Sequence, residues 1–215
     1  MLDITTLRSI PLFSRLSEGE LAELRGRLKV REIRKNAVII WEGGLGSELD
    51  IILSGCVRVF KTGERGKEVT LAVLRAGDFF GEIALLTNSP RTANVIALEK
   101  TALLELSRED FISHLGKHSG LPLALAQSLA ERLRLASGKL SDMALLDVPH
   151  RLLTTLERMA GPHPSGKGRI VIDRPTHQEL ADMVGSSREV ISRCLKSLEQ
   201  QGQLIVEGKN IVIPK

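Results

Sequence analysis

Residues 30–106 constrain the fold more than any other part of this 215-residue chain. They contain short apolar runs separated by turns that are rich in glycine. The runs occupy residues 38–40, 49–53, 57–60, 69–74, 93–98 and 102–106. Short apolar runs bounded by turn residues are typical of an all-β sandwich or barrel. We therefore predict a β-barrel of the jelly-roll type for this region.

The segment 79–95 interrupts these strands with residues suited to binding an anion. Gly81 lets the backbone approach a ligand, and a helical turn from Glu82 to Leu86 offers free N–H groups. Arg91 supplies a planar, permanently charged guanidinium that matches a phosphate, and Glu82 can accept a hydrogen bond from a hydroxyl. Together they predict a pocket for a sugar phosphate. Taken singly, Arg91 could be a surface ion-pair partner and Glu82 a solvated acid in a turn.

Helical patterns flank the strands. A capping-box pattern at residues 17–20 precedes leucines at helical spacing, and Ser107 begins another helix. A long helix is predicted from Gly120 to about Leu146, and we expect Pro149 to end it. Apolar residues recur on this helix at alternating spacings of three and four: Ala126, Leu129, Leu133, Ala136, Leu140 and Met143. This heptad seam favours a parallel dimer, and a core helix packed on the barrel is the alternative.

The last third of the chain carries the pattern of a winged helix-turn-helix. Capping boxes at residues 176–179 and 186–189 open two helices, which we expect to run through Val184 and about Gln200, with Gly185 between them. Residues 204–213 predict a hairpin, the wing. Residues 149–215 contain ten Lys and Arg against seven Asp and Glu. That excess fits a nucleic-acid surface.

The second of these helices carries the residues that we expect to read DNA. In a major groove its first turn meets base edges. Arg188 is then placed for guanine O6 and N7 and Glu189 for a cytosine amino group, with Arg193 one turn further along. The structural alternative is that Glu189 only caps Ser186. Three further residues are expected to contact phosphates: Gln178, Ser187 and Lys196.

The segment 79–95 resembles the phosphate-binding cassette of cyclic-nucleotide-binding domains, with its Gly-Glu and Pro-Arg-Thr-Ala elements intact. A cassette, a long helix and a helix-turn-helix, in that order, resemble the Crp/Fnr family of transcription regulators over nearly the whole chain. The resemblance implies a homodimer that binds a cyclic nucleotide and double-stranded DNA, at a palindromic operator with TGTGA-like half-sites. It implies these ligand-binding residues: Gly81, Glu82, Ile83, Ala84, Arg91, Thr92, Arg132 and Ser137.

Two of these residues lie on the long helix. The resemblance implies that Arg132 pairs with the cassette glutamate and that Ser137 contacts the base across the dimer, although both also suit plain flanking positions of a coiled coil. Ala136 stands where the cyclic AMP receptor protein has a threonine that contacts adenine, and Thr92 resembles cyclic-GMP-selective domains. We predict cyclic AMP in preference to cyclic GMP. The alternative is a regulator of this type whose barrel senses another effector, such as cyclic di-GMP, or none.

Other classes of protein fit the sequence less well. Without a signal-peptide pattern or an apolar run near the ~20 residues of a membrane span, we expect a cytoplasmic protein with no membrane partner. Cys56 and Cys194 show no disulfide or metal spacing. His114 and His118 lie four residues apart, but Gly116 weakens the helix and no third ligand is evident. We therefore predict no metal site.

We predict no enzymatic activity and no covalent cofactor. No Ser/His/Asp or Cys/His arrangement presents itself. A cupin-type enzyme would need metal ligands in the strands, and residues 30–106 contain no histidine. The N-terminus also lacks the cysteine cluster of an iron–sulfur protein. The loop 161–168 matches one that contacts RNA polymerase in activators, and its composition equally suits a plain loop.

The domain prediction divides an α+β chain into three parts. Residues 1–120 are expected to form the cyclic-nucleotide-binding domain, residues 121–148 the dimerisation helix, and residues 149–215 the winged helix-turn-helix domain.

Overall fold

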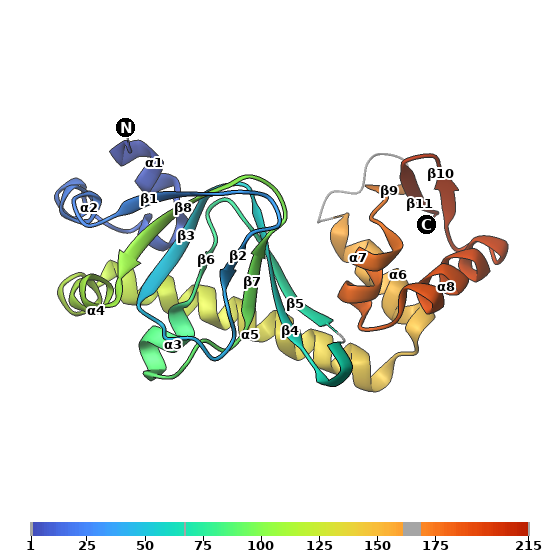
Figure 1. Cartoon of the computed structure of the whole chain (residues 1–215). Coiled ribbons are helices and arrows are strands. Elements are labelled where there is room, and N and C mark those ends of the chain that lie inside the picture. Colours follow the sequence, from blue (N-terminus) through green and yellow to red (C-terminus); the bar gives the residue numbers. More distant parts are fainter. Residues whose placement is uncertain (1, 67, 161–168, 215) are drawn as a thin grey trace. The chain divides into compact units, whose positions relative to one another are not determined.

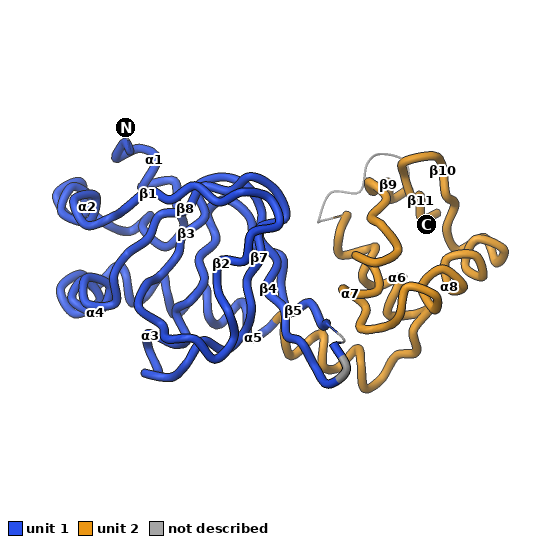
Figure 2. The backbone as a smooth tube through the Cα atoms, in the orientation of Figure 1, with its two compact units in different colours: residues 1–134 blue, residues 135–215 orange. Residues whose placement is uncertain are grey.

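The computed structural model describes residues 2–66, 68–160 and 169–214, so the loop 161–168 lies outside the described residues. The chain forms two compact units, residues 1–134 and residues 135–215 (Figure 2). The division falls inside the long helix α5 (Gly120–Leu145). Each unit is described by itself.

Unit 1 begins with the helices α1 (Ile4–Ser9), η1 (Pro11–Phe13) and α2 (Glu18–Arg25). The capping box predicted for α2 is present. The Ser17 hydroxyl accepts from the Glu20 N–H, and the Glu20 carboxylate accepts from the Ser17 N–H at 2.7 Å. These reciprocal bonds satisfy two donors that a helix start leaves without partners. The apolar face of α2 buries Leu21 and Leu24 completely.

Two four-stranded antiparallel sheets form the body of unit 1 (Figure 1). The strand order is β1-β8-β3-β6 in one sheet and β2-β7-β4-β5 in the other. The two sheets are separate, so the predicted jelly roll is a sandwich rather than one closed barrel. The strands are β1 (Lys29–Ile33), β2 (Val38–Ile40), β3 (Glu48–Ser54), β4 (Cys56–Thr62), β5 (Glu68–Arg75), β6 (Phe79–Phe80), β7 (Asn94–Ala97) and β8 (Thr101–Ser107), and a short turn, η2 (Glu64–Gly66), joins β4 to β5.

The central strand β3 separates two apolar cores because successive side chains of a strand point to opposite faces. Leu49 and Ile51 pack among the helices of unit 1 with Leu21 and Phe111. Ile52 faces the other way and packs between the sheets. Asp50 shares that inner face by the same alternation, and its side chain is buried. A carboxyl group therefore lies inside the sandwich.

The predicted cassette forms a short helix, α3 (Glu82–Thr87), between β6 and β7. After β8 come α4 (Arg108–Lys117), which Ser107 caps as expected, and then α5. Leu121, Ala124 and Leu125 at the start of α5 pack into the core of unit 1.

The predicted heptad seam of α5 touches this core only near its start, where Leu129 packs against it. Of its members, Leu133, Leu140 and Met143 are 68%, 69% and 58% exposed in the single chain. The seam residues past Leu129 therefore do not form the core stripe that was the alternative interpretation.

Unit 2 contains the helix-turn-helix and its wing. Its elements are α6 (Val148–Met159), β9 (Arg169–Asp173), α7 (His177–Val184), α8 (Arg188–Gln200), β10 (Ile205–Glu207) and β11 (Asn210–Pro214). Three helices and a three-stranded sheet in the order β10-β11-β9 enclose one core, with Leu156, Leu180, Ile191 and Ile211 fully buried. Gly185 joins α7 to α8 with a φ of +73°, which glycine adopts without strain.

Three local predictions for unit 2 need correction. Pro149 does not end the long helix. Asp147 caps α6 and Pro149 sits in its first turn, where a missing N–H is harmless. The second capping box does not form either. Ser187, not Ser186, caps α8, and its hydroxyl accepts from the Val190 N–H at 3.3 Å. The strand β9, which pairs with β11, was not predicted.

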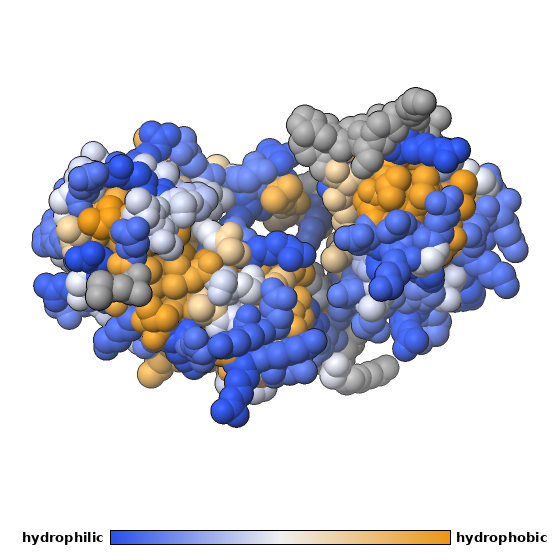
Figure 3. All heavy atoms as spheres, turned by 90° about the horizontal axis from the view of Figure 1, so that it is seen from above, coloured by the Kyte–Doolittle hydropathy of each residue, from blue (hydrophilic) through white to orange (hydrophobic). Residues whose placement is uncertain are grey.

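Hydrophobic residues gather in patches on a largely hydrophilic surface (Figure 3). Among the described residues, no helix combines the length and the apolar character that crossing a membrane requires.

Candidate effector pocket and nucleic-acid interface

Arg91 lies beside the start of the cassette helix. Its side chain is 6% exposed. Nη1 donates to the Gly81 carbonyl at 3.1 Å and Nη2 to the Glu48 carbonyl at 2.9 Å, while the Glu48 carboxylate lies 3.6 Å from Nη2. Arg91 is therefore buried, and the carboxylate beside it belongs to the partly exposed Glu48. A guanidinium has five N–H donors, so donors remain for a ligand anion.

Gly81 permits this close approach of the guanidinium. It is the N-cap of α3 and has a φ of +88°, a conformation that residues with a side chain rarely adopt. A Cβ atom here would lie 2.2 Å from Arg91 Nη1 and 3.1 Å from the Glu48 carbonyl oxygen. Backbone conformation and space therefore both require glycine.

A glycine-rich loop before β3 is fastened to the cassette. The Gly43 N–H donates to the Arg91 carbonyl and the Arg91 N–H to the Gly44 carbonyl, both at 2.8 Å. A Cβ atom on Gly46 would lie 2.6 Å from the Ala84 Cβ. Sequence reasoning treated these glycines as turn residues and missed them, together with Glu48, as neighbours of the site. The only feature of the sequence that could have indicated them is the close spacing of Gly43, Gly44 and Gly46.

Glu82 is paired with Arg132 of the long helix, as the resemblance implies. The Glu82 side chain is buried, and Arg132 Nη1 donates to its Oε1 at 2.9 Å. Arg132 also donates to the Phe79 carbonyl at 2.5 Å, and its guanidinium lies 4.4 Å above the Phe79 ring centroid. Burial raises the pKa of Glu82, and the charge of Arg132 opposes that rise. Glu82 is therefore not a solvated turn acid.

Asp50 is a further carboxyl group near Arg91 that the sequence did not single out. It is 3% exposed, and its Oδ1 has no hydrogen-bond partner among the described residues. Burial raises its pKa to about 7, although the nearby charge of Arg91 opposes the rise.

The remaining predicted ligand residues are placed as follows. Ala84 is buried beside the glycine loop, while Ile83 and Thr92 are exposed at the cassette surface. Ser137 is exposed on α5 and belongs to unit 2. The structure thus brings together Gly81, Glu82, Arg91 and Arg132.

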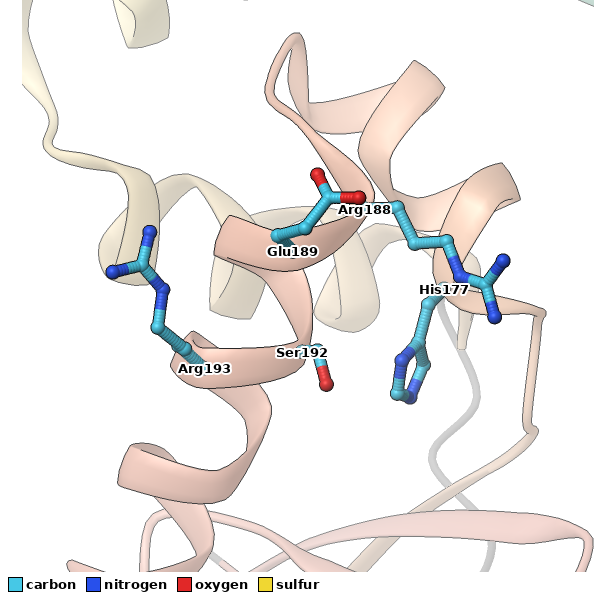
Figure 4. A pocket seen from close by; sticks show the side chains of 5 residues that line it. All are labelled: His177, Arg188, Glu189, Ser192 and Arg193. Atoms are coloured by element: carbon cyan, nitrogen blue, oxygen red, sulfur yellow. The ribbon is translucent and has the colours of Figure 1, made fainter.

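The start of α8 forms a shallow hollow of about 360 Å³ on unit 2. His177, Arg188, Glu189, Ser192 and Arg193 line it, and Arg188 and Arg193 extend to opposite sides of Ser192 (Figure 4). His177 and Ser192 were not predicted. Ser192 lies one helical turn after Arg188, so helical spacing could have indicated it.

Glu189 lies in the first turn of α8. Its own backbone N–H and the Ser187 hydroxyl lower its pKa, with smaller contributions from Arg188 and Arg193. The carboxylate is therefore ionised and can accept hydrogen bonds. It does not cap Ser186, because the box that would need it is not formed.

The predicted phosphate contacts are all at the surface. Gln178 and Lys196 are exposed, and the Gln178 amide donates to Asp182 at 2.9 Å. Ser187 is exposed too, and its hydroxyl oxygen is engaged in capping α8.

A sandwich with an anion-binding cassette, combined with a winged helix-turn-helix, defines a ligand-responsive DNA-binding protein. Known families match both parts. A cyclic nucleotide-binding domain matches residues 30–118, and a Crp-like helix-turn-helix domain matches residues 150–215.

Characterised relatives cover nearly the whole chain. The cyclic AMP receptor protein of Thermus thermophilus is 35% identical over 91% of this chain and 88% of that protein. The cAMP-activated global transcriptional regulator Vfr of Pseudomonas aeruginosa is 34% identical over 85% of this chain and 88% of that protein. This chain belongs to the Crp/Fnr family of transcription regulators. It is a cyclic-nucleotide-responsive DNA-binding regulator, and its family is not one of enzymes.

Solved structures agree with this assignment. The c-di-GMP-responsive global regulator CLP of Xanthomonas campestris matches with a TM-score of 0.77 at 27% identity, over 93% of this chain and all of that one. The catabolite activator protein of Thermus thermophilus matches with a TM-score of 0.57 at 32% identity, over 94% of this chain and 93% of that one.

Proposed function

We propose that this protein is a homodimeric transcription regulator that cyclic AMP converts to a form binding a palindromic operator with TGTGA-like half-sites. The observation that carries the proposal is the buried Arg91 guanidinium at the cassette, next to the paired Glu82. The similarity to two regulators named for cyclic AMP favours that nucleotide.

Each pocket residue has a proposed role. Arg91 and the N–H groups of residues 81–84 bind the cyclic phosphate, because a guanidinium and free backbone N–H groups both favour an anion. Glu82 accepts from the ribose hydroxyl. Thr92 at the surface and Ser137 of the partner subunit face the base.

The Glu82–Arg132 pair connects this pocket to the long helix within unit 1. A ribose hydroxyl that binds Glu82 changes the surroundings of this carboxylate, which accepts a hydrogen bond from Arg132 of α5. A ligand shifts a conformational equilibrium only through contacts that differ between the two states. We propose that this contact is one of them, and that it alters α5 and thereby the spacing of the two recognition helices. Binding requires a spacing of about 34 Å, one turn of DNA.

On the DNA, Arg188 reads guanine and Glu189 reads the amino group of cytosine, with Arg193 on the next turn. Gln178, Ser187 and Lys196 contact phosphates and set the register. We also propose a cytoplasmic location. For the domains we propose a cyclic-nucleotide-binding part in residues 1–120, a dimerisation helix in residues 121–148 and a DNA-binding part in residues 149–215. Contact of the loop 161–168 with RNA polymerase stays a prediction.

A second candidate effector is cyclic di-GMP. The similarity to CLP, which is c-di-GMP-responsive, favours it. At Ala136 this chain lacks the hydroxyl that the cyclic AMP receptor protein offers to adenine. That difference weakens the argument for cyclic AMP as the effector. In this alternative the DNA-reading residues keep their roles.

The test is fluorescence anisotropy of a labelled palindromic duplex, with the protein stripped of nucleotide and then given cyclic AMP, cyclic GMP or cyclic di-GMP. We expect cyclic AMP to tighten operator binding at least tenfold. Arg91→Ala should abolish that response, whereas Arg25→Ala, which removes an exposed arginine of α2, should preserve it.

Three results would change the conclusion. A response to cyclic di-GMP alone would select the second candidate. Operator binding that does not depend on any nucleotide would contradict the proposal that a nucleotide controls DNA binding. An Arg91→Ala protein that still responds to cyclic AMP would refute the assignment of the pocket.

A further inference from the structure

Two histidines and a glutamate converge in unit 1, away from the cassette. Glu23 lies on α2, His114 on α4, and His118 caps the C-terminal end of α4 (Figure 1). One ligand atom from each residue lies within 4.8 Å of the other two. The Nε2 atoms of His114 and His118 lie 4.0 Å and 3.9 Å from the Glu23 carboxylate oxygens. Sequence alone offered no third ligand, because Glu23 is far away in the chain, but α4 continues through Gly116 and the fold supplies it.

Both histidines turn Nε2 toward Glu23 and have a hydrogen-bond partner for Nδ1 on the other side of the ring. His114 Nδ1 lies 2.8 Å from the Asp110 carbonyl, which can only accept, so Nδ1 carries the proton. His118 Nδ1 lies 2.7 Å from Glu20 Oε1, and the other oxygen of that carboxylate accepts from the Ser17 N–H. A carboxylate oxygen accepts, so Nδ1 of His118 is the donor there too. The tautomer with the proton on Nδ1 leaves Nε2 of each ring as the atom that can bind a cation.

These two Nε2 atoms are buried and have no hydrogen-bond partner among the described residues. The His114 side chain is 3% exposed and that of His118 is 11% exposed. Buried polar atoms nearly always have a partner, so two unsatisfied ring nitrogens facing one carboxylate require an explanation. A cation held between them would satisfy all three groups.

The outer contacts also match those of metal sites. Histidines that bind a metal usually donate their other ring N–H to a carboxylate or a backbone carbonyl, which fixes the ring. His118 has the first kind of partner and His114 the second. Glu20 is itself held, because its other oxygen accepts from the Ser17 N–H in the capping box of α2.

We propose that His114, His118 and Glu23 bind a divalent transition-metal ion, zinc foremost, with water as the fourth ligand. Two histidines and a glutamate are a ligand set that zinc uses. Donors around tetrahedral zinc lie about 3.3 Å apart, given bonds of ~2.0 Å. The Glu23 side chain is 45% exposed and can turn to shorten its distances to both rings, while a turn of the rings themselves brings the two Nε2 atoms together. Lys117 Nζ lies 3.5 Å from a Glu23 carboxylate oxygen, on a side chain that is 58% exposed, so we expect it to turn into solvent when the ion binds.

Such an ion would fasten α2 to the segment between α4 and α5. His118 stands just before Gly120, where the long helix begins. The site therefore offers a second ligand input to unit 1, independent of the cassette. The metal site uses none of the pocket residues, so its test is independent of the test of the proposed function.

The experiment is a zinc titration of the full-length protein after chelator treatment and desalting, by calorimetry and by competition with a coloured chelator. We expect one high-affinity zinc per chain and a rise in melting temperature. Glu23→Gln, His114→Gln and His118→Gln should each weaken binding at least tenfold. His150→Gln should not, since that histidine is 70% exposed on α6.

Glu20→Gln tests the outer contact. Glutamine can keep the capping box of α2 but removes the charge that orients His118. We expect zinc binding to weaken about 10- to 100-fold while the melting temperature without metal stays unchanged. A purely structural role for Glu20 would lower that melting temperature and leave zinc affinity alone.

Two outcomes would overturn the proposal. One is the absence of saturable zinc binding to the folded protein. The other is zinc binding that Glu23→Gln and His118→Gln both leave unchanged, which would place the ion elsewhere. Glu23 is exposed, so its variant remains informative even if replacement of the buried His114 disturbs folding.

Discussion

At the scale of single residues, the pocket depends on one guanidinium held by backbone carbonyls. Arg91 is fixed by Gly81 and Glu48 before any ligand arrives. Fixing a charged side chain in advance reduces the ordering that a ligand must later impose. The pocket therefore depends on the absence of a side chain at residue 81 as much as on Arg91.

Gly81→Ala should disable the pocket. The new methyl group would clash with the Arg91 guanidinium and occupy a φ that alanine disfavours, a strain of about 1–3 kcal/mol. We expect lower stability by roughly that amount and loss of nucleotide binding, checked by thermal melting and calorimetry. Gly19→Ala is the control, because its Cβ would meet nothing within 4 Å. Normal affinity in Gly81→Ala would contradict this account.

Asp50 should make stability fall as pH rises. Its pKa is about 7 in the folded chain against 3.8 for the free side chain. Below pH ~4 both states hold the proton, and between ~4 and ~7 only the folded state does. The folded state therefore loses stability relative to the unfolded state through that window, by at most about 4 kcal/mol.

Asp50→Asn removes this titration. Relative to wild type, we expect the free energy of unfolding of the variant to rise between pH 4 and pH 8, as measured by urea melts. Asp173→Asn, which changes an exposed acid, should run parallel to wild type. A constant difference across that range would show that Asp50 is ionised in the fold.

At the scale of elements, short hydrogen-bonded caps decide where the DNA-reading helix begins. Ser187 caps α8, although the pattern Ser186-Ser187-Arg188-Glu189 predicted Ser186. With Ser187 as the cap, Arg188 and Glu189 are the first two residues of the helix rather than the second and third.

Ser187→Ala should therefore cost about 1 kcal/mol of stability, the usual value of an N-cap. Ser186→Ala should change stability by less than about 0.5 kcal/mol. Urea melts followed by circular dichroism compare the two. A larger loss from Ser186→Ala would restore the capping box that the sequence predicted.

At the scale of the whole molecule, the exposed seam of α5 is the basis for the proposed homodimer. A row of leucine and methionine at heptad spacing is poorly placed in water, and pairing with the same row in a parallel coiled coil would bury it.

Leu140→Glu should convert dimers to monomers, because it would bury like charges opposite each other at the seam. Sedimentation velocity measures the change. Leu145→Glu is the matched control, since Leu145 is 80% exposed on the same helix but outside the seam. A wild-type protein that sediments as a monomer at all concentrations would end the dimer proposal.

The sequence by itself determined the elements whose signals are local. The capping boxes of α2 and α7, the six strands predicted between residues 38 and 106, the long helix and the turn at Gly185 each depend on residues a few positions apart. The cassette was recognisable for the same reason, because Gly81, Glu82 and Arg91 lie within one short segment.

The tertiary structure decided what depends on distant residues. β1 buries only Ile33 and β6 has two residues, so neither carries a strong pattern of its own. β9 differs, because its β-branched run Ile170-Val171-Ile172 is a local strand signal that the sequence prediction overlooked. Glu48 and Asp50 reach Arg91, and Glu23 reaches two histidines, only after folding. Burial and the long-range pairing of charges arise from packing, which no local pattern of residues specifies.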